Sequence, residues 1–264
     1  MSHRLLSVLL YLFAGLIGLV ALLFPFIRAS LPPDGGGASL LRLEETPLLA
    51  TLLVTLCLAV LLVELQGQAA GAKVVAALGI MVAVTSTLRF IEVGIPGPAG
   101  FSPIFAPIIL GGYVFGARFG FLLGAMTMLV SAIITAGVGP WLPYQMFTAG
   151  WVGFTAGLLP HPRRPSVEVG MLLLFAFVWG FLYGGIMNLS TWPYLAGDPR
   201  ISYAPGAGVA EAVRRYAAFY LATSLVWDSA AAIGNVLIIG VLGLPTIKAL
   251  SRFRGRLQFH VVRP

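Results

Sequence analysis

The sequence predicts an all-α protein embedded in a membrane, with about eight transmembrane helices. Two features of its composition indicate this class: 59% of its 264 residues are hydrophobic and only 9% are charged. Soluble domains carry about 25% charged residues, so this chain lacks the polar surface to cover a water-soluble globule of its size. The third feature is the arrangement of the apolar residues, which form runs long enough to cross a bilayer.

Eight apolar runs are candidate helices. A transmembrane helix needs about 20 residues. The first run has 23, whereas the apolar part of a signal peptide has about 7–15, so we expect a true span. The fourth and sixth runs are short, and such helices survive at membrane depth only where protein or a water-filled cavity shields them, which predicts a cavity close to both. The runs cover residues 5–27, 47–65, 72–91, 103–116, 119–137, 145–159, 167–189 and 216–244.

Basic residues predict the orientation. With eight spans, ten of the sixteen basic residues fall on one side, together with two acids, Glu64 and Glu168. That side carries +8 and the other −1, which together give the net charge of +7. Cytoplasmic loops are enriched in Lys and Arg, so both termini are expected in the cytoplasm. The ten residues are Arg4, Lys73, Arg118, Arg163, Arg164, Lys248, Arg252, Arg254, Arg256 and Arg263.

Several classes of function lack the residues that they need. Membrane orientation explains the positive charge, so no nucleic acid is expected as a partner. The chain has no phosphate-binding Gly-x-x-x-x-Gly-Lys motif and no signature of a hydrolase. Its single cysteine, Cys57, lies inside an apolar run, and His3, His161 and His260 are scattered along the chain. We therefore expect no enzyme, no metal site and no cofactor.

The connections on the predicted outer side, at 93–101, 137–144 and 190–214, are rich in Gly, Pro and aromatic residues. Rigid turns that carry aromatic side chains suit a binding site, but Trp and Tyr also form belts at the membrane interface, and both interpretations stay open. Prolines fix the backbone in the second connection. The candidate substrate-binding residues in and after these connections are Trp141, Tyr144, Gln145, Asn188 and Trp192.

The last apolar run carries a polar arc centred on Asp228. A carboxylate inside a span costs at least about 2.5–3.5 kcal/mol, so it marks a functional site or pairs with a cation. The candidate cation is Arg89, which is also spaced to pair with Glu92 three residues later. A ligand site and a structural ion pair stay equally open. Geometry of about 100° per residue places on this arc Tyr220, Ser224, Trp227, Asp228, Ala231 and Asn235. The ten candidate substrate-binding residues are completed by Arg89, Tyr220, Trp227, Asp228 and Asn235.

Small residues form a narrow stripe on the third run. Ala72, Ala76, Gly79 and Ala83 fall within about a 60° arc, and such residues let two helices approach closely. The partner is either an internal neighbour or another subunit. We interpret two further small-residue pairs, Gly120 with Gly124 and Gly153 with Gly157, as internal packing. In the first run, Gly15, Gly18 and Ala21 allow packing against the rest of the protein.

Two runs, FAPIILGGYVFGARFGFLLGA at 105–125 and GVGPWLPYQMFTAGWVGFTAGLLP at 137–160, resemble the substrate-binding S components of energy-coupling-factor transporters. The segment TSLVWD at 223–228, with Asn235, looks like the last helix of one subgroup of these proteins. The resemblance covers about residues 72–250.

The resemblance implies a six-helix core at 71–250 in the bacterial inner membrane, which takes up a vitamin, in this subgroup a cobalamin-like one, at the outer face. It implies docking through the first core helix, at the Ala72 and Ala76 stripe, onto a transmembrane coupling subunit driven by two ATPases of the ATP-binding-cassette type. The hairpin at 1–70 precedes this core, and it is either an accessory element or a cover for the docking face. A basic cytoplasmic tail at 251–264 follows the core. The alternative function is a self-sufficient secondary transporter that couples to an ion at Asp228.

Overall fold

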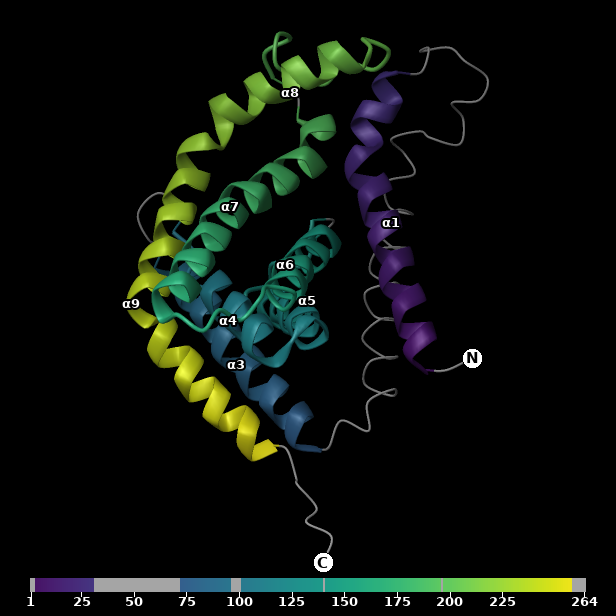
Figure 1. The fold of residues 1–264 in the computed structure, drawn as a ribbon. Coiled ribbons are helices and arrows are strands. Elements are labelled where there is room, and N and C mark those ends of the chain that lie inside the picture. The colour runs from purple at the N-terminus through teal and green to yellow at the C-terminus, as the bar shows by residue number, and fades with distance from the viewer. Residues whose placement is uncertain (1–2, 31–71, 96–100, 140, 196, 258–264) are drawn as a thin grey trace, which may run out of the picture.

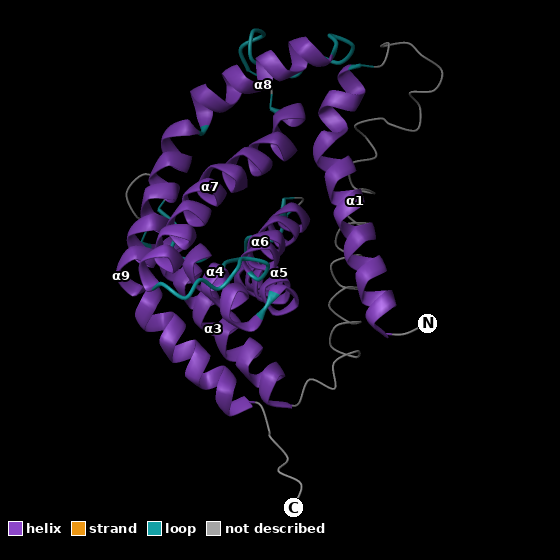
Figure 2. Ribbon diagram, viewed as in Figure 1, coloured by secondary structure: helices purple, strands orange, loops and turns teal. Residues whose placement is uncertain are grey.

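The computed structural model describes residues 3–30, 72–95, 101–139, 141–195 and 197–257, and every regular element among them is helical (Figures 1 and 2). This confirms the all-α class. The span predicted at 47–65 lies outside the described residues. The elements are α1 (His3–Ala29), α3 (Ala72–Gly94), α4 (Phe105–Phe115), α5 (Ala117–Ile134), α6 (Leu142–Ala156), α7 (Pro165–Thr191), the 3-10 helix η4 (Trp192–Tyr194), α8 (Val209–Thr223) and α9 (Leu225–Leu257).

Four stretches of the described helices are long and apolar enough to cross a membrane: Lys73–Gly94, Ala117–Ile134, Pro165–Tyr194 and Leu225–Gly255. The runs expected to be short form short helices, with 11 residues in α4 and 15 in α6. The chain is therefore a multi-pass membrane protein. A total of eight spans stays a prediction.

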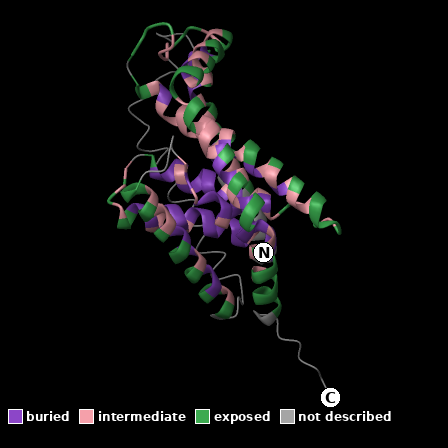
Figure 3. Cartoon of the chain, turned by 90° about the vertical axis from the view of Figure 1, so that its left-hand side faces the viewer, coloured by how far each residue is buried: buried purple, intermediate pink, exposed green. Residues whose placement is uncertain are grey.

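Glycines bring α5 and α6 into backbone contact at the centre of the molecule. A Cβ atom added to Gly120 would lie 2.1 Å from the carbonyl oxygen of Gly153, and one added to Gly157 would lie 2.2 Å from the backbone nitrogen of Ala117. Only a residue without Cβ permits such an approach, which stabilises helix association in lipid through packing. Figure 3 shows the buried residues gathered in the middle of the molecule, where α4, α5 and α6 contribute most of them. The prediction of internal packing by Gly120, Gly124, Gly153 and Gly157 is confirmed.

Helix α1 packs against α6 through its small residues. A Cβ atom on Gly18 would lie 2.0 Å from the ring of Phe147, and one on Gly15 would lie 3.1 Å from the ring of Trp151. Packing against the rest of the protein is thus confirmed for Gly15 and Gly18. The side chain of Ala21 is not among those that the structure describes. Helix α1 also contacts α7 and α8, and Ala76, Gly79 and Ala83 of the stripe on α3 are exposed.

The single span predicted at 216–244 is wrong: the structure has two helices, α8 and α9, that meet at a bend at Ser224 (Figure 1). Ser224 has φ −126° and ψ −26°, outside the α-helical values, so the regular helix ends at Thr223 and starts again at Leu225. Part of the outer connection expected at 190–214 is therefore helical, and α9 continues to Leu257, past the core boundary expected at residue 250.

A small aromatic cluster holds η4 and α8 to the end of α1. Trp192 is fully buried, and its ring centroid lies 6.2 Å from that of Phe26 and 5.4 Å from that of Tyr216. The indole N–H of Trp192 donates to the carbonyl of Ile201 at 2.9 Å. We call residues 192–223 the outer lobe, because they follow the end of α7 that is expected on the outer side.

The opposite end of the bundle gathers groups that the charge distribution assigns to the cytoplasm. The hydroxyl of Tyr113, at the end of α4, donates to Glu168 at 2.7 Å and its ring stacks on His161 at 4.3 Å. From α9, the guanidinium of Arg254 donates to the carbonyl of Val114 at 2.5 Å. The structure thus places His161, Glu168 and Arg254 together at one end of the bundle.

Candidate functional site

A cavity of about 380 Å³ lies between the outer ends of α3, α6, α7 and α9. It is close to the short helices α4 and α6, where the sequence predicts a cavity: Phe105 of α4 and Gln145 of α6 are part of its lining. Six of the ten predicted substrate-binding residues line it, although they are up to 139 positions apart in the chain. They are Arg89, Trp141, Gln145, Asn188, Trp227 and Asp228.

One wall of the cavity carries an ion pair within α3. A guanidinium nitrogen of Arg89 lies 3.8 Å from a carboxylate oxygen of Glu92, and both side chains are largely buried. The hydroxyl of Ser102 donates to the other oxygen of Glu92 at 2.8 Å. The pairing of Arg89 left open by the sequence is therefore with Glu92, and no ion pair joins Arg89 to Asp228 among the described residues.

On the facing wall, the carboxylate of Asp228 is seated against the backbone of α7. A Cβ atom on Gly184 would lie 1.9 Å from Oδ1 of Asp228, so the carboxylate occupies space that any larger residue would fill. Oδ2 of Asp228 and the hydroxyl of Tyr220 are both buried, and neither has a hydrogen-bond partner in the described part of the chain. The two groups lie side by side, so the hydroxyl of Tyr220 is a donor available to the carboxylate of Asp228. A buried acceptor without a donor costs about 1–3 kcal/mol, and more when charged.

Aromatic and amide side chains complete the lining. Trp141 and Trp227 are about half exposed, and the indole N–H of Trp141 donates to the carbonyl of Gly137 at 3.1 Å. The ring of Tyr183 packs edge-on against Phe105 at 4.5 Å. Ligand pockets commonly combine apolar and aromatic walls with a few placed polar groups, and this cavity has that composition.

Four predicted site residues lie outside the cavity lining. Tyr144 is buried in the hydrophobic core, Trp192 is buried in the outer lobe, and Asn235 is 1% exposed within α9. Tyr220 does not line the cavity but lies beside Asp228. Residue type and helical spacing do not separate a cavity-facing aromatic from one that anchors a helix end.

Sequence reasoning also missed lining residues, among them Tyr183, Gly184, Ser102 and Met187. Tyr183 followed by Gly184 and Gly185 interrupts the apolar run of α7, and this interruption was the available signal. Small residues inside a span allow a close neighbour, which here is the carboxylate of Asp228.

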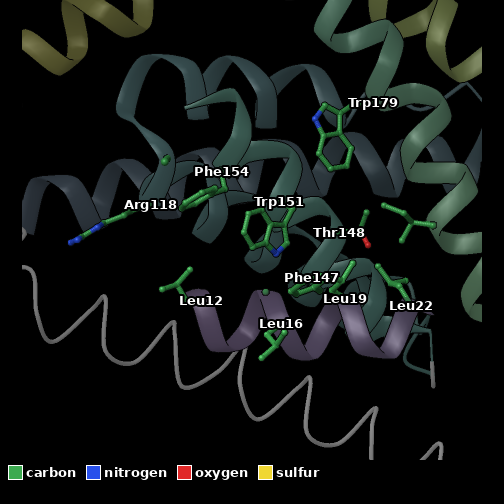
Figure 4. A pocket seen from close by; sticks show the side chains of 13 residues that line it. Leu12, Leu16, Leu19, Leu22, Arg118, Phe147, Thr148, Trp151, Phe154 and Trp179 are labelled. Atoms are coloured by element: carbon green, nitrogen blue, oxygen red, sulfur yellow. The ribbon is translucent and has the colours of Figure 1, made fainter. Parts of the chain in front are cut away.

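A larger cavity of about 730 Å³ separates α1 from α5, α6 and α7 (Figure 4). Leucines of α1 face Phe147, Trp151 and Phe154 across it, and the polar side chains in its lining are Thr148, Arg118 and the indoles of Trp151 and Trp179. Such a surface suits hydrocarbon and gives a polar ligand few groups to orient it. The smaller cavity is therefore the candidate substrate site.

The small-residue stripe of α3 faces away from the core. Ala76, Gly79 and Ala83 are exposed, and a Cβ atom on Gly79 would meet nothing within 4 Å. The opposite side of the helix packs inward through Ala77 and Val82. The side chain of Ala72 lies outside the description. This face is therefore not covered by any other helix in the described part of the chain.

The profile of one protein family, described as the substrate-specific component of ECF transporters, matches residues 73–243. The match starts at the first core helix and covers more than half of the chain. No curated protein and no solved structure matches the sequence. A multi-pass helical protein with a cavity at one end of its core agrees with this assignment, and the chain belongs to the family of substrate-specific components of energy-coupling-factor transporters.

Proposed function

We propose that this subunit captures a vitamin or related micronutrient at the outer face and holds it in the 380 Å³ cavity. The observation that carries the proposal is the convergence of Arg89, Gln145, Asn188 and Asp228 from four separate helices on one space lined by aromatic rings. Side chains from distant parts of a chain meet in this way where a ligand has to be oriented.

The cavity volume supports a small substrate. Pockets for drug-sized ligands have about 300–1,000 Å³, and 380 Å³ lies near the lower limit. A corrinoid with its nucleotide arm is far larger than a drug-sized ligand. The cavity therefore favours a vitamin with one or two rings over a cobalamin-like one.

The proposed orientation puts both termini in the cytoplasm of a bacterial cell and the cavity on the outside. The +8 and −1 division of charge supports it. So does the bond of Arg254 to the end of α4, which also bonds to Glu168 of α7 through Tyr113. A reporter fused after Pro264 is expected to behave as cytoplasmic. External labelling of that fusion would contradict this orientation.

Transport would require partners. We propose that Ala72, Ala76, Gly79 and Ala83 form the surface that docks on a transmembrane coupling subunit, which two ATPases of the ATP-binding-cassette type drive. Close helix approach needs small residues, and Gly79 has open space above it.

Gly79→Leu should abolish uptake in cells that contain the coupling subunit and ATPases, while the purified subunit keeps its thermal stability and its ligand. Gly170→Leu is the matched control, since Gly170 is an exposed glycine of α7 that also has nothing within 4 Å. Equal loss of uptake in both variants, or loss of binding in Gly79→Leu, would contradict a docking role for the stripe.

A self-sufficient secondary transporter remains the second candidate, because Asp228 is a carboxylate within a membrane-spanning helix and such groups can carry ions or protons. Reconstitution into liposomes separates the two functions. We expect no accumulation under an ion gradient with the subunit alone, and accumulation with ATP once the coupling subunit and ATPases are added. Accumulation by the subunit alone would establish the second function.

A further inference from the structure

Among the described residues, the carboxylate of Asp228 has one neutral donor beside it, the hydroxyl of Tyr220, and no cation pairs with it. Oδ2 is shielded from solvent and has no partner among the described residues. The packing of α7 against α9 fixes the position of this carboxylate, because it occupies the space beside Gly184 that any side chain there would fill. Uncompensated buried charges are unfavourable, so a donor or a cation from outside the chain would stabilise this arrangement.

The remaining charges of the cavity do not neutralise Asp228. Arg89 and Glu92 both belong to α3 and pair with each other, and the lining residues from α6 and α7 carry no charge. The described lining therefore has one positive and two negative groups, a net charge of −1. An anion would meet this charge in a partly desolvated space, where like charges repel strongly.

Three hydroxyl groups of the lining, those of Ser102, Ser190 and Thr191, present acceptors rather than donors. The hydroxyl of Ser102 donates to Glu92. Those of Ser190 and Thr191 donate to carbonyls of the preceding turn of α7. Their protons are engaged, and their oxygens remain as acceptors. A ligand that supplies N–H donors fits these three hydroxyl oxygens better than one that supplies acceptors.

Aromatic rings add a further preference for a cation. Trp141 and Trp227 line the same cavity as Asp228. A cation over the face of a tryptophan gains about 0.5–2 kcal/mol, more when desolvated. Charge, hydrogen bonding and ring chemistry thus favour the same class of ligand.

We propose that the substrate carries a positively charged nitrogen that pairs with Asp228, and that it has no net negative charge. This inference rests on the proposed function of the cavity and specifies its ligand: a small organic cation with a volume below 380 Å³. Arg89 stays paired with Glu92 and shapes the opposite wall.

The test measures the thermal stability of the purified full-length subunit in detergent, with Na⁺ alone and with a panel of vitamins and related nutrients sorted by charge. Thiamine, pyridoxamine and choline are the cations, nicotinamide and pyridoxine are neutral, and biotin and pantothenate are anions. We expect stabilisation by at least one cation and by no anion. Asp228→Asn, which keeps the shape of the side chain, should weaken that binding by about tenfold or more, equivalent to about 1.4 kcal/mol.

Asp198→Asn is the matched control, since Asp198 is a carboxylate of the outer lobe that does not line the cavity; it should bind like the wild type. Stabilisation only by neutral or anionic members, or binding of a cation that Asp228→Asn leaves unchanged, would overturn this inference and leave the proposed function standing. Stabilisation by Na⁺ alone that depends on Asp228 would overturn both in favour of an ion-coupled transporter. No stabilisation by any member would count against both proposals.

Discussion

Gly184→Ala should remove substrate binding without unfolding the protein. An added Cβ would lie 1.9 Å from Oδ1 and 2.0 Å from Oδ2 of Asp228. Nonbonded contacts are optimal at about 3.5–4.0 Å, so the carboxylate has to move by roughly 1.5 Å or change its rotamer. A displaced rotamer costs about 0.5–1.5 kcal/mol, whereas replacing glycine by alanine inside a helix gains about 0.5–1 kcal/mol. These two effects nearly cancel in the free energy of unfolding.

Binding has no such compensation, because the carboxylate leaves the position where it meets the ligand. We expect the affinity for the stabilising cation to fall by about tenfold or more, with little change in the melting temperature of the free protein. Gly185→Ala is the neighbouring control: its Cβ would meet the nearest atom, from Tyr220, at 3.8 Å. Thermal unfolding with and without the cation measures both quantities. If the two variants bind equally well, the seat of Asp228 against Gly184 has no role in recognition.

Three further predictions concern stability. Gly153→Ala should lower the free energy of unfolding by about 1–3 kcal/mol, as overpacking does, because its Cβ would lie 2.1 Å from the carbonyl oxygen of Gly120. Thermal unfolding measures this loss, and the control Gly170→Ala, whose Cβ would meet no atom within 4 Å, should show none. Trp192→Ala should destabilise the outer lobe by about 3–5 kcal/mol, seen as faster proteolysis between α7 and α9, and an unchanged cleavage rate would refute its anchoring role. Neighbouring arginines lower the pKa values of the Asp198 and Glu211 carboxyls to about 2, below their unfolded values near 4, so their small contribution to stability should be present above pH 4 and lost as the pH falls toward 2. Melting temperatures across that range should fall less steeply in the double variant Asp198→Asn, Glu211→Gln.

The sequence predicted the parts of the fold that depend on composition and periodicity. Apolar runs identified α1, α3, α5 and α7 to within a few residues, and the glycine pairs identified the contact between α5 and α6. These features follow from local physics, because lipid demands apolar surface and close helix packing demands small residues.

The bend at Ser224 was not predictable from the same information. Apolar residues continue from α8 into α9, and no Gly or Pro marks the position where the backbone of Ser224 leaves the helical conformation. A serine can continue a helix, or it can interrupt one by offering the backbone other hydrogen bonds. The packing of the surrounding helices decides which of the two occurs. The burial of Trp192 and Tyr144 was not predictable either. Aromatic residues at a predicted interface serve equally as anchors of a helix end or as walls of a cavity.

Helix α3 connects the candidate substrate site with the proposed docking surface. Arg89 and Glu92 stand at its outer end in the cavity wall, and the exposed face with Ala76 and Gly79 lies nearer its inner end. With a rise of about 1.5 Å per residue, Ala76 and Arg89 are separated by about 20 Å along the helix. Effects of substitutions add when sites are more than about 7–10 Å apart and share no partner. Substitutions on the proposed docking face are therefore expected to change transport alone, and substitutions at Asp228 to change ligand binding. If their effects on transport, expressed as free energies, do not add in the double variant, the difference measures how strongly α3 links ligand occupancy to docking.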